Sequence, residues 1–246
     1  MKQLQYILPG EPIPRGSFFH QRRYRVALAM TDNLQGGGSL LDIGCGNASQ
    51  TEFFAQHVDY AIGIDLQHHR LAEFHDELDR SNAENITLIG GSAQRLPFRD
   101  ETFDCITCFE MLEHVPDQAK VLNEIHRVLK PEGRIILSVP HRWWIFETHG
   151  ADLPLLPWNR VPFFSWLPKK IHDAWARARI YTESEIRKII GESGFKEVQA
   201  KLLTAPMDVV KNERLQQLLR KTIFRGDTTT IPFLSSTIFA SAKKST

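Results

Sequence analysis

The residues with the clearest chemical potential lie in a glycine-rich turn. Residues 40–49, Leu-Leu-Asp-Ile-Gly-Cys-Gly-Asn-Ala-Ser, predict a short buried strand that runs into a tight turn. A helix should begin near residues 47–49, since Asn and Ser are good N-cap residues. Gly44 and Gly46 let the backbone turn and let a ligand approach main-chain N–H groups, and the positive end of the helix dipole points to the same place. The turn is therefore a candidate nucleotide-type pocket.

An acidic residue at the end of the next strand supports this pocket. Residues 60–65 predict a strand that ends in Asp65, about twenty residues after the glycines, where a ribose-binding carboxylate is expected. The spacing Gly-x-Gly-x-x-Ser departs from the full dinucleotide fingerprint, which has a third glycine. In the alternative interpretation the turn binds nothing and Asp65 is a solvated strand end. We favour the pocket, because strand, turn, helix and acidic strand end occur in the expected order.

Strands and helices alternate along most of the chain, which predicts a parallel sheet with right-handed crossovers. Thr182 and Glu185 form a capping-box pattern at the start of one helix, and residues 130–133, Lys-Pro-Glu-Gly, should end another. The patterns predict further strands over 86–89, 103–109, 134–139, 195–202 and 233–242, and helices over 18–33, 68–80, 118–129, 182–193 and 212–224.

The stretch from residue 140 to residue 180 breaks this alternation. It holds all five tryptophans, Trp143, Trp144, Trp158, Trp166 and Trp175, together with several prolines. Its length and its position after the fifth strand fit a lid or substrate subdomain. The aromatic content favours an apolar acceptor or a peripheral contact with a membrane surface, where Trp is common. In the alternative, these aromatic side chains form only the small core of the lid itself.

Length and composition limit the other possibilities. A chain of 246 residues with 42% apolar residues fits one domain over 1–246, with an N-terminal arm and helix over 1–38 and an insertion over 141–180. The net charge of +1 gives no clear nucleic-acid signal and no electrostatic argument for an anionic membrane. No apolar run has the length of a membrane span, and the N-terminus lacks a signal-peptide pattern.

The three cysteines argue against a disulfide framework. Cys105 and Cys108 lie three residues apart in a predicted strand, so they should face opposite sides of the sheet and share neither a metal nor a disulfide. A reducing compartment follows from this cysteine usage, and we expect a cytoplasmic protein that touches the membrane at most peripherally.

Three arginines lie on the helix predicted before the glycine-rich turn. We favour a solvated face for Arg22, Arg23 and Arg25. From this position, however, one of them could reach a carboxylate of a bound cofactor.

Several short motifs together resemble one family. The chain resembles the class I S-adenosylmethionine-dependent methyltransferases, in the broad group that includes the ubiquinone- and menaquinone-biosynthesis enzymes. The resemblance covers about residues 39–140 and, more loosely, 182–242. It implies an α/β fold with a Rossmann-like seven-stranded sheet, helices on both faces and an aromatic-rich insertion after strand 5. All strands should be parallel except the last, which inserts beside the fifth. The motifs are Leu41-Asp42-Ile43-Gly44-Cys45-Gly46, Gly63-Ile64-Asp65, Leu96-Pro97-Phe98, Phe103-Asp104, Glu110-Met111-Leu112-Glu113-His114-Val115 and Leu129-Lys130-Pro131-Glu132-Gly133.

The resemblance implies which residues hold the methionine part of S-adenosylmethionine. Gly44, Cys45 and Gly46 match the turn that wraps the amino-acid end of the cofactor. Asp42 matches the acid that supports this turn and the methionine ammonium. Phe109 matches a residue whose backbone lines the methionine portion.

It also implies the contacts of the nucleoside. Asp65 matches the acid that binds both ribose hydroxyls, and Leu66 matches a side chain that flanks adenine. Ala93 and Gln94 lie where the family contacts the adenine edge. Many relatives have Asp where this chain has Ser92, and a hydroxyl can still make one hydrogen bond. We therefore expect weaker selectivity for adenine rather than loss of binding.

Some relatives hold a divalent metal near the acceptor oxygen with a Glu-x-x-Glu-His motif. Glu110, Glu113 and His114 match that motif, and His141 or His149 would be the natural fourth ligand. A metal there would lower the pKa of an acceptor hydroxyl. The motif is also widespread without metal, and we favour a structural or substrate-positioning role for the acids over metal binding.

A general base is the remaining catalytic question. His141 directly follows the fifth strand, at the carboxyl edge where sites lie in such sheets, and His149 lies in the insertion over the same edge. Either histidine is a candidate base, and His114 is a third catalytic candidate. The alternative for each is a hydrogen-bonded loop histidine.

The expected function is transfer of a methyl group from S-adenosylmethionine to a small, apolar, lipid- or quinone-like acceptor, with O-methylation favoured. A nicotinamide-dependent dehydrogenase is disfavoured by the missing third glycine and by the absence of a Tyr-x-x-x-Lys pair. A catalytically silent relative that binds the cofactor, or a methyltransferase acting on RNA or a glycan, remains as the alternative. The oligomeric state does not follow from the sequence.

Overall fold

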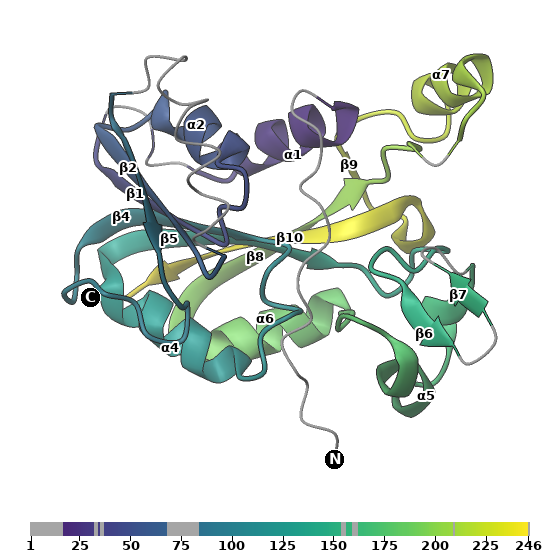
Figure 1. The fold of residues 1–246 in the computed structure, drawn as a ribbon. Coiled ribbons are helices and arrows are strands. Elements are labelled where there is room, and N and C mark those ends of the chain that lie inside the picture. Colours follow the sequence, from purple (N-terminus) through teal and green to yellow (C-terminus); the bar gives the residue numbers. More distant parts are fainter. Residues whose placement is uncertain are drawn as a thin grey trace.

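One mixed sheet forms the centre of the molecule (Figure 1). We describe a computed structural model, which covers residues 17–31, 34, 37–67, 84–153, 156–158, 162–208 and 210–245. Within these residues the strand order is β3-β2-β1-β4-β5-β10-β8-β9. The strands are β1 (Ser39–Ile43), β2 (Tyr60–Asp65), β3 (Ile86–Gly90), β4 (Phe103–Phe109), β5 (Leu129–Pro140), β8 (Phe195–Thr204), β9 (Thr228–Thr229) and β10 (Ser235–Lys244).

The sheet topology confirms the expected methyltransferase-like arrangement. Strands β3, β2, β1, β4 and β5 are parallel neighbours. The last strand, β10, runs antiparallel between β5 and β8. The sheet has eight strands rather than seven because the two-residue strand β9 pairs with the outer edge of β8, at Leu202 and Leu203.

Helices cover both faces of the sheet, as expected (Figure 1). Helices α1 (Phe18–Leu28) and α2 (Ser49–Ala55) lie on one face, where Val26 and Phe54 join a buried apolar cluster. Helices α4 (Gln118–Val128) and α6 (Glu183–Glu192) lie on the other face, where Ile125 and Ile186 join the larger cluster. The arm over 1–16 and the helix expected over 68–80 lie outside the described residues.

Local sequence signals explain how several of these elements begin and end. At the start of α6, the Thr182 hydroxyl accepts from the Glu185 N–H while the Glu185 carboxylate accepts from the Thr182 N–H, which confirms the capping box. Helix α4 ends at Val128, just before residues 130–133, as expected, and these residues already belong to β5, which begins at Leu129. Leu129 pairs with Phe103 and Arg134 pairs with Cys105, so the residues between them bulge out of the ladder.

The two cysteines of β4 lie on opposite faces of the sheet, as expected. Cys105 belongs to the cluster under α1 and α2, and Cys108 to the cluster under α4 and α6. Both thiols are free and buried, and burial raises the pKa of Cys105 to about 12. They are therefore inert core residues.

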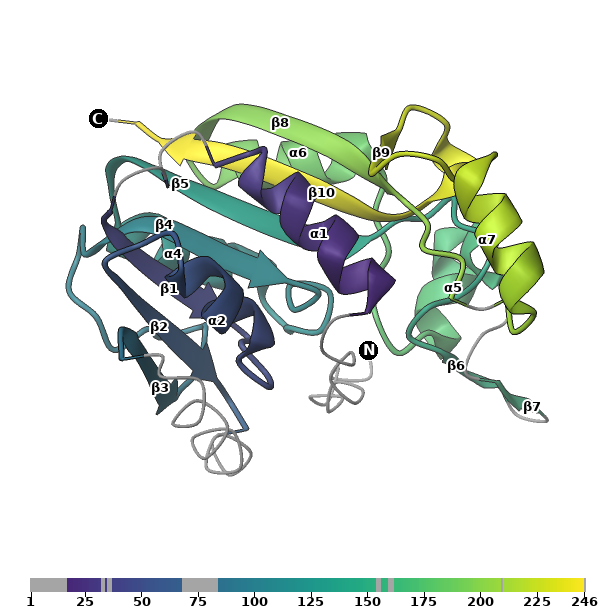
Figure 2. The ribbon, with the colours of Figure 1, turned by 90° about the horizontal axis from the view of Figure 1, so that it is seen from above.

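The segment between β5 and α6 lies at one end of the sheet (Figures 1 and 2). It contains a two-stranded hairpin of β6 (Ala151–Leu153) and β7 (Leu156–Trp158), a short 3-10 helix η1 (Phe164–Trp166) and helix α5 (Lys169–Trp175). Helix α7 (Glu213–Lys221) lies at the same end and is followed by η2 (Pro232–Leu234). Among the described helices, none has the length and apolar character needed to cross a bilayer.

Candidate active site

The glycine-rich turn between β1 and α2 differs in one respect from the expectation. Gly44 and Gly46 have positive φ angles of 75° and 52°. The N–H groups of Gly44 and Cys45 donate to the carbonyl oxygen of Ile64 at 2.8 and 3.2 Å, and the Gly46 N–H donates to Asp65 Oδ2 at 2.9 Å. These three N–H groups are therefore committed to the protein. The turn leaves space for a ligand beside Gly46, because a Cβ placed on this residue would meet no atom within 4 Å.

The helix after this turn starts where expected but is capped differently. Helix α2 begins at Ser49, and its N-cap residue is Ala48 in a left-handed conformation, without a side-chain cap. The Asn47 side chain instead accepts from the Ser49 hydroxyl at 2.8 Å. The predicted Asn or Ser cap was wrong because these two side chains bond to each other.

Asp65 is held at the end of β2 with its carboxylate fixed by backbone. Its Oδ1 accepts from the Gln67 N–H at 2.8 Å, and its Oδ2 accepts from the Gly46 N–H. A carboxylate has about four acceptor positions, so about two remain for other donors. Two hydroxyl groups on neighbouring carbons fit these remaining positions.

The proposed adenine residues lie beside Asp65. Asp65 pairs with Gly90 at the end of β3, so the residues that follow β3 are brought next to the end of β2. Ser92, Ala93 and Gln94 are half-buried there, and Leu66 is exposed. The structure thus brings the predicted nucleoside contacts together at one edge of the sheet.

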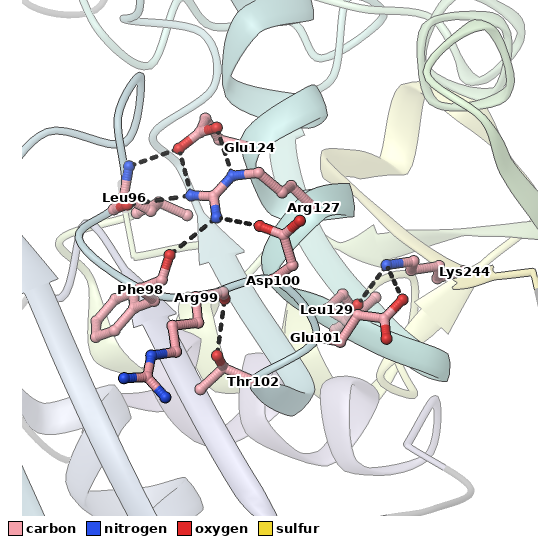
Figure 3. A network of polar contacts seen from close by, with 10 residues as sticks. All are labelled: Leu96, Phe98, Arg99, Asp100, Glu101, Thr102, Glu124, Arg127, Leu129 and Lys244. Carbon is pink, nitrogen blue, oxygen red and sulfur yellow. Dashed lines mark hydrogen bonds and ion pairs between the residues drawn. The ribbon is translucent and has the colours of Figure 1, made fainter.

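The loop after these residues is tied to helix α4 by an arginine (Figure 3). Arg127 donates to the carbonyl oxygens of Leu96 and Phe98 at 3.1 and 2.9 Å and to Asp100 at 2.8 Å. Its guanidinium also contacts Glu124 at 2.8 Å, and Glu124 accepts from the Leu96 N–H at 2.8 Å. The Arg127 hydrogen bond holds the pKa of Glu124 below its usual range. This network anchors residues 96–100 of the loop between β3 and β4, which also carries the predicted contacts to the adenine edge and which we call the adenine-side loop.

Asp42 is a fully buried acid below the glycine-rich turn. Its carboxylate accepts from Gln50 and Thr51 of α2 and from Thr107 of β4, the two threonine bonds being 2.7 and 2.8 Å long. Burial raises the pKa of Asp42 to about 6, and the three hydrogen bonds oppose this rise. A cation placed beside this carboxylate would favour its charged form.

The arginines of α1 are not a solvated face, which corrects the expectation. Only Arg25 is exposed, in an ion pair with Asp227. Arg22 is buried and donates to the carbonyl oxygens of Thr204, Ala205 and Phe224. It therefore has a structural role.

Arg23 is buried without hydrogen-bond partners for two of its nitrogens, Nε and Nη2. Its guanidinium carbon lies 4.6 Å from the centre of the Phe19 ring and 5.6 Å from that of Phe109. Burial lowers its pKa, and the charges of Glu110 and Asp42 oppose this effect. A buried, incompletely paired guanidinium beside the predicted methionine site fits a ligand carboxylate.

A second polar group forms where the segment after β4 meets the insertion. Glu113, His114 and His149 each present one atom within 4.8 Å of the others. His149 Nε2 lies 3.5 Å and His114 Nε2 3.8 Å from Glu113 Oε1. The two imidazole rings meet edge to face at 5.0 Å.

The electrostatics of this group are unusual. Both carboxylate oxygens of Glu113 and Nδ1 of His114 are buried without a hydrogen bond. Burial raises the pKa of Glu113 well above its ordinary value. Burial also lowers the pKa of His149 and lowers that of His114 to about 4. The imidazoles are thus neutral near pH 7, which is the form that binds metals and accepts protons.

Glu110 stands at the rim of this group. Its Oε1 accepts from the Ser138 hydroxyl at 2.8 Å, and its Oε2 lies 4.0 Å from His149 Nε2. The set expected from the sequence was Glu110, Glu113 and His114, whereas the structure brings Glu113 and His114 together with His149.

His141 lies outside this cluster. It is buried, and its ring Nδ1 lies 3.2 Å from the carbonyl oxygen of Ser235, with a further bond to the Pro232 carbonyl. These contacts hold the segment that enters β10. Of the two loop histidines proposed as the base, only His149 reaches the acidic cluster.

A buried network inside the insertion fixes His149, and the sequence analysis missed it. Glu147 Oε1 accepts from the His149 N–H at 3.1 Å. Glu147 Oε2 contacts His172 Nε2 at 2.9 Å and the Ser165 hydroxyl at 3.3 Å. The irregular spacing of these residues gives no sequence signal for the contact. Glu147 joins α5 and η1 to the loop that carries His149.

Comparison with known proteins places this geometry in a family. A model of the methyltransferase domain matches residues 41–137. The ubiquinone biosynthesis O-methyltransferase of Pseudomonas aeruginosa is 35% identical over 164 residues, which is 63% of this chain and 68% of that protein. The chain belongs to the class I S-adenosylmethionine-dependent methyltransferases. S-adenosylmethionine is the cofactor of this methyltransferase.

A second relative agrees with this assignment, and two solved structures share the fold. The methyltransferase is 35% identical to the demethylmenaquinone methyltransferase of Staphylococcus epidermidis over 142 residues, 56% of this chain and 55% of that one. The YcgJ protein of Bacillus subtilis has a similar fold, with a TM-score of 0.62 and 20% identity over 92% of this chain and 99% of that chain. Phosphoethanolamine N-methyltransferase 2 of Haemonchus contortus, solved with S-adenosylmethionine, gives a TM-score of 0.63 at 17% identity over 91% of this chain and 52% of that chain.

Proposed function

We propose that this methyltransferase transfers the methyl group of S-adenosylmethionine to a hydroxyl oxygen of a small, apolar, quinol-type acceptor. The observation that carries the proposal is the group formed by the buried Glu113 and the half-buried His114 and His149, beyond the carboxyl end of β4. Two matched relatives, named for ubiquinone biosynthesis O-methylation and for demethylmenaquinone methylation, support a quinone-like acceptor. The neutral imidazoles support oxygen as the methylated atom, because a hydroxyl must lose its proton during transfer.

In this proposal the turn and its neighbours bind the cofactor. Asp65 takes the two ribose hydroxyls, while Leu66, Ser92, Ala93 and Gln94 surround the adenine. Asp42 supports the methionine ammonium below Gly44, Cys45 and Gly46, and the backbone of Phe109 lines the methionine chain. The buried guanidinium of Arg23 pairs with the methionine carboxylate, which supplies the partner that its unpaired nitrogens lack.

The chemical step is an in-line displacement. The acceptor oxygen attacks the methyl carbon, the bond from that carbon to sulfur breaks with its electron pair going to sulfur, and the sulfonium becomes a neutral thioether. The hydroxyl proton passes to the neutral imidazole of His149, with His114 beside it. His141 is not assigned as the base, because its ring is held by backbone carbonyl oxygens.

The same group has the composition of a divalent-cation site. Carboxylate and imidazole are common ligands of such cations, and the unbonded oxygens of the buried Glu113 fit a positive charge. In this version Glu113, His114 and His149 hold the cation, with Glu110 at the rim. A bound cation would lower the pKa of the acceptor hydroxyl.

The insertion over 141–180 acts as a lid in this proposal, and the chain over 1–246 acts as one methyltransferase domain. Glu147 ties the His149 loop to α5 through His172, so closing the lid and placing His149 are one event. Excluding water from the site then favours transfer over side reactions.

A methyl-transfer assay tests the acceptor. The purified protein is incubated with labelled S-adenosylmethionine and a short-tailed catechol-type quinol, beside the same compound with both hydroxyls already methylated. We expect an O-methylated product, identified by mass spectrometry, from the first acceptor only. A carbon-methylated product, or none from any quinol, would contradict the proposal.

Variants and chelation test the site in the same assay. His149→Ala should lower kcat roughly 10²–10⁴-fold with cofactor binding unchanged, since a general base contributes about that much. His126→Ala, a half-buried histidine of α4 that packs on Phe195, is the matched control. Loss of activity after EDTA, restored by Mg²⁺, Mn²⁺ or Zn²⁺, would support the cation version, and activity unchanged by EDTA would leave the imidazole alone as the base.

Calorimetry tests the cofactor residues. Asp65→Ala removes two charge-assisted hydrogen bonds to ribose, which contribute roughly 1.5–3 kcal/mol each. We expect S-adenosylmethionine binding to weaken at least about a hundredfold. Asp152→Ala, an exposed acid paired with Arg177, should bind normally. Unchanged affinity in the Asp65 variant would refute the ribose assignment.

A further inference from the structure

The exposed apolar side chains of this methyltransferase gather at one end. Twelve large apolar side chains are exposed among the described residues, and ten of them lie between residues 143–175 or 215–233. The exceptions are Tyr60 and Leu66. In both ribbon views, α5, β6, β7 and α7 share the end of the molecule to which these ten residues belong (Figures 1 and 2). Scattered exposed apolar residues need no explanation, but such a concentration marks an interaction surface.

Four aromatic rings form the first part of this surface. Trp143, Phe163, Trp166 and Phe233 are each 38–52% exposed. The Phe233 ring lies 6.1 Å from Trp143 and 5.5 Å from Trp166, which in turn lies 5.1 Å from Phe163. We call these four residues the aromatic patch. It joins the insertion to the η2 segment, which is distant in sequence.

Helix α7 forms the second part. None of its side chains is buried, and Leu215 and Leu218, three residues apart on one face, are 47% and 58% exposed. Arg214 and Lys221 are exposed and seven residues apart, so they follow one flank of this apolar stripe. The helix is therefore amphipathic, with its apolar face toward solvent.

Contacts just beyond the helix attach α7 to the insertion. The Phe224 ring lies 6.3 Å from that of Trp144, the neighbour of Trp143. The two parts of the surface thus belong to one packed unit rather than to separate loops.

The segments that form this end of the molecule also carry an excess of basic residues. Residues 141–180 and 207–234 together carry eleven Lys and Arg against six Asp and Glu, whereas the rest of the chain carries nineteen against twenty-three. The net charge of +1 conceals this separation. An apolar surface with an excess of basic residues complements an anionic one.

We propose that this end of the methyltransferase docks on an anionic lipid bilayer, with α7 lying in the interface and the aromatic patch at the headgroup level. Amphipathic helices with basic flanks and exposed Trp are suited to that environment. The inference deepens the proposed function, since an acceptor with an apolar tail resides in a bilayer. The sequence suggested membrane contact through 141–180 alone, and the structure adds α7 and η2.

Vesicle co-sedimentation tests the proposal with the full chain and no acceptor. The vesicles are pure phosphatidylcholine, or phosphatidylcholine with about 30% phosphatidylglycerol. We expect binding to the anionic vesicles at low salt, with a large loss at 0.5 M salt. The pair Arg214→Gln and Lys221→Gln should lower partitioning roughly 25-fold, about fivefold for each basic residue removed.

Apolar variants test insertion separately from charge. Leu218→Glu and Trp166→Glu should each abolish most binding, while Tyr60→Glu, an exposed aromatic outside this surface, should not. Lys188→Gln on α6 is the control for the basic pair. All variants should bind S-adenosylmethionine with the wild-type affinity, which shows that they are folded.

The outcomes separate this inference from the proposed function. If the wild-type protein does not bind anionic vesicles but methylates a short-tailed quinol, the docking proposal alone is wrong. Vesicle binding that survives the Leu218 and Trp166 changes would also overturn it. Self-association of the wild type that Leu218→Glu abolishes, without vesicle binding, would assign the surface to a second copy of the chain. Vesicle binding without any methyl transfer to quinols would leave the surface standing and reject the acceptor.

Discussion

Arg23 is buried in surroundings that disfavour stability and that suit the carboxylate of the proposed ligand. Its guanidinium is buried between Phe19 and Phe109 with two nitrogens unpaired. Leaving a buried charge unpaired destabilises the folded state, and a ligand carboxylate would remove that defect. The residue is therefore prepared for an anionic group.

Replacing Arg23 should therefore have opposite effects on the stability of the free protein and on its affinity for S-adenosylmethionine. Arg23→Met should leave the free energy of unfolding of the cofactor-free protein unchanged or raise it, while weakening S-adenosylmethionine binding at least about tenfold, the loss of roughly one charge-assisted bond. Thermal unfolding and calorimetry measure the two effects. Arg22→Met is the control: it removes hydrogen bonds to three carbonyl groups and should lower stability. If Arg23→Met destabilised the free protein as strongly as Arg22→Met, Arg23 would be structural.

In the proposed site, Asp42 should make cofactor binding depend on pH. Its folded-state pKa of about 6 means that it becomes protonated as the pH falls through 6. A cationic ammonium beside it favours the charged carboxylate, so binding lowers this pKa and releases a proton near pH 6. Affinity should therefore be constant above about pH 7 and fall toward tenfold per pH unit well below pH 6.

Calorimetry at pH 5, 6 and 7.5, in buffers of different ionisation enthalpy, measures both the affinity and the proton release. Asp42→Asn should bind more weakly at pH 7.5 and lose the pH dependence. A wild-type affinity that stays flat from pH 5 to 7.5 would place the ammonium away from Asp42.

At the scale of elements, the adenine-side loop depends on helix α4. Arg127 joins Leu96, Phe98 and Asp100 to Glu124, so one side chain fixes the backbone of the loop (Figure 3). If this loop binds the cofactor as proposed, its pre-formed conformation lowers the entropic cost of binding. Its position is set by α4, which contributes none of the residues proposed to bind the cofactor.

Arg127→Ala should lower the free energy of unfolding by about 2 kcal/mol, because several hydrogen bonds of about 0.5–1.5 kcal/mol are lost from a partly exposed site. Urea unfolding measures this. Arg177→Ala removes a surface ion pair with Asp152 and should change stability by less than about 1 kcal/mol. Amide exchange should quicken at residues 96–100 in the first variant only, and uniform exchange changes would argue against a local anchor.

The elements were predictable where pattern and local chemistry agree. The run of apolar residues in β4 and the stripe of α4 gave both elements within a residue of their ends, and the capping box of α6 was visible in two residues. Residues 130–133 follow the end of α4 at Val128, as predicted, but the start of β5 was missed, because pairing with β4 extends this strand back to Leu129. Tertiary pairing there lengthened the strand beyond its local sequence pattern.

At the scale of the whole molecule, only the part of the candidate site that is made of contiguous sequence motifs could be predicted. The nucleoside side, from Asp65 to Gln94, depends on neighbouring parallel strands whose order follows from topology. The acceptor side depends on the path of an irregular insertion, so neither the approach of His149 to Glu113 nor the Glu147–His172 contact could be derived. The burial of Arg22 and Arg23 was missed because the periodicity of α1 does not show that residues of β8 and β4 pack against these two side chains.

The position of β10 has a consequence for how the chain is made. This strand, the last element of the described chain, fills the gap between β5 and β8 and pairs with both. During synthesis, residues up to 204 emerge from the ribosome with the side of β5 that faces β10 unpaired and with β8 lacking its central neighbour. An unpaired strand edge is a template for association with other chains, and nascent domains complete their fold only when their last central element arrives. The sheet can therefore be completed only after residues 235–244 have left the exit tunnel. A nascent chain stalled before that point would expose the unpaired edges of β5 and β8 to other nascent chains on the same mRNA.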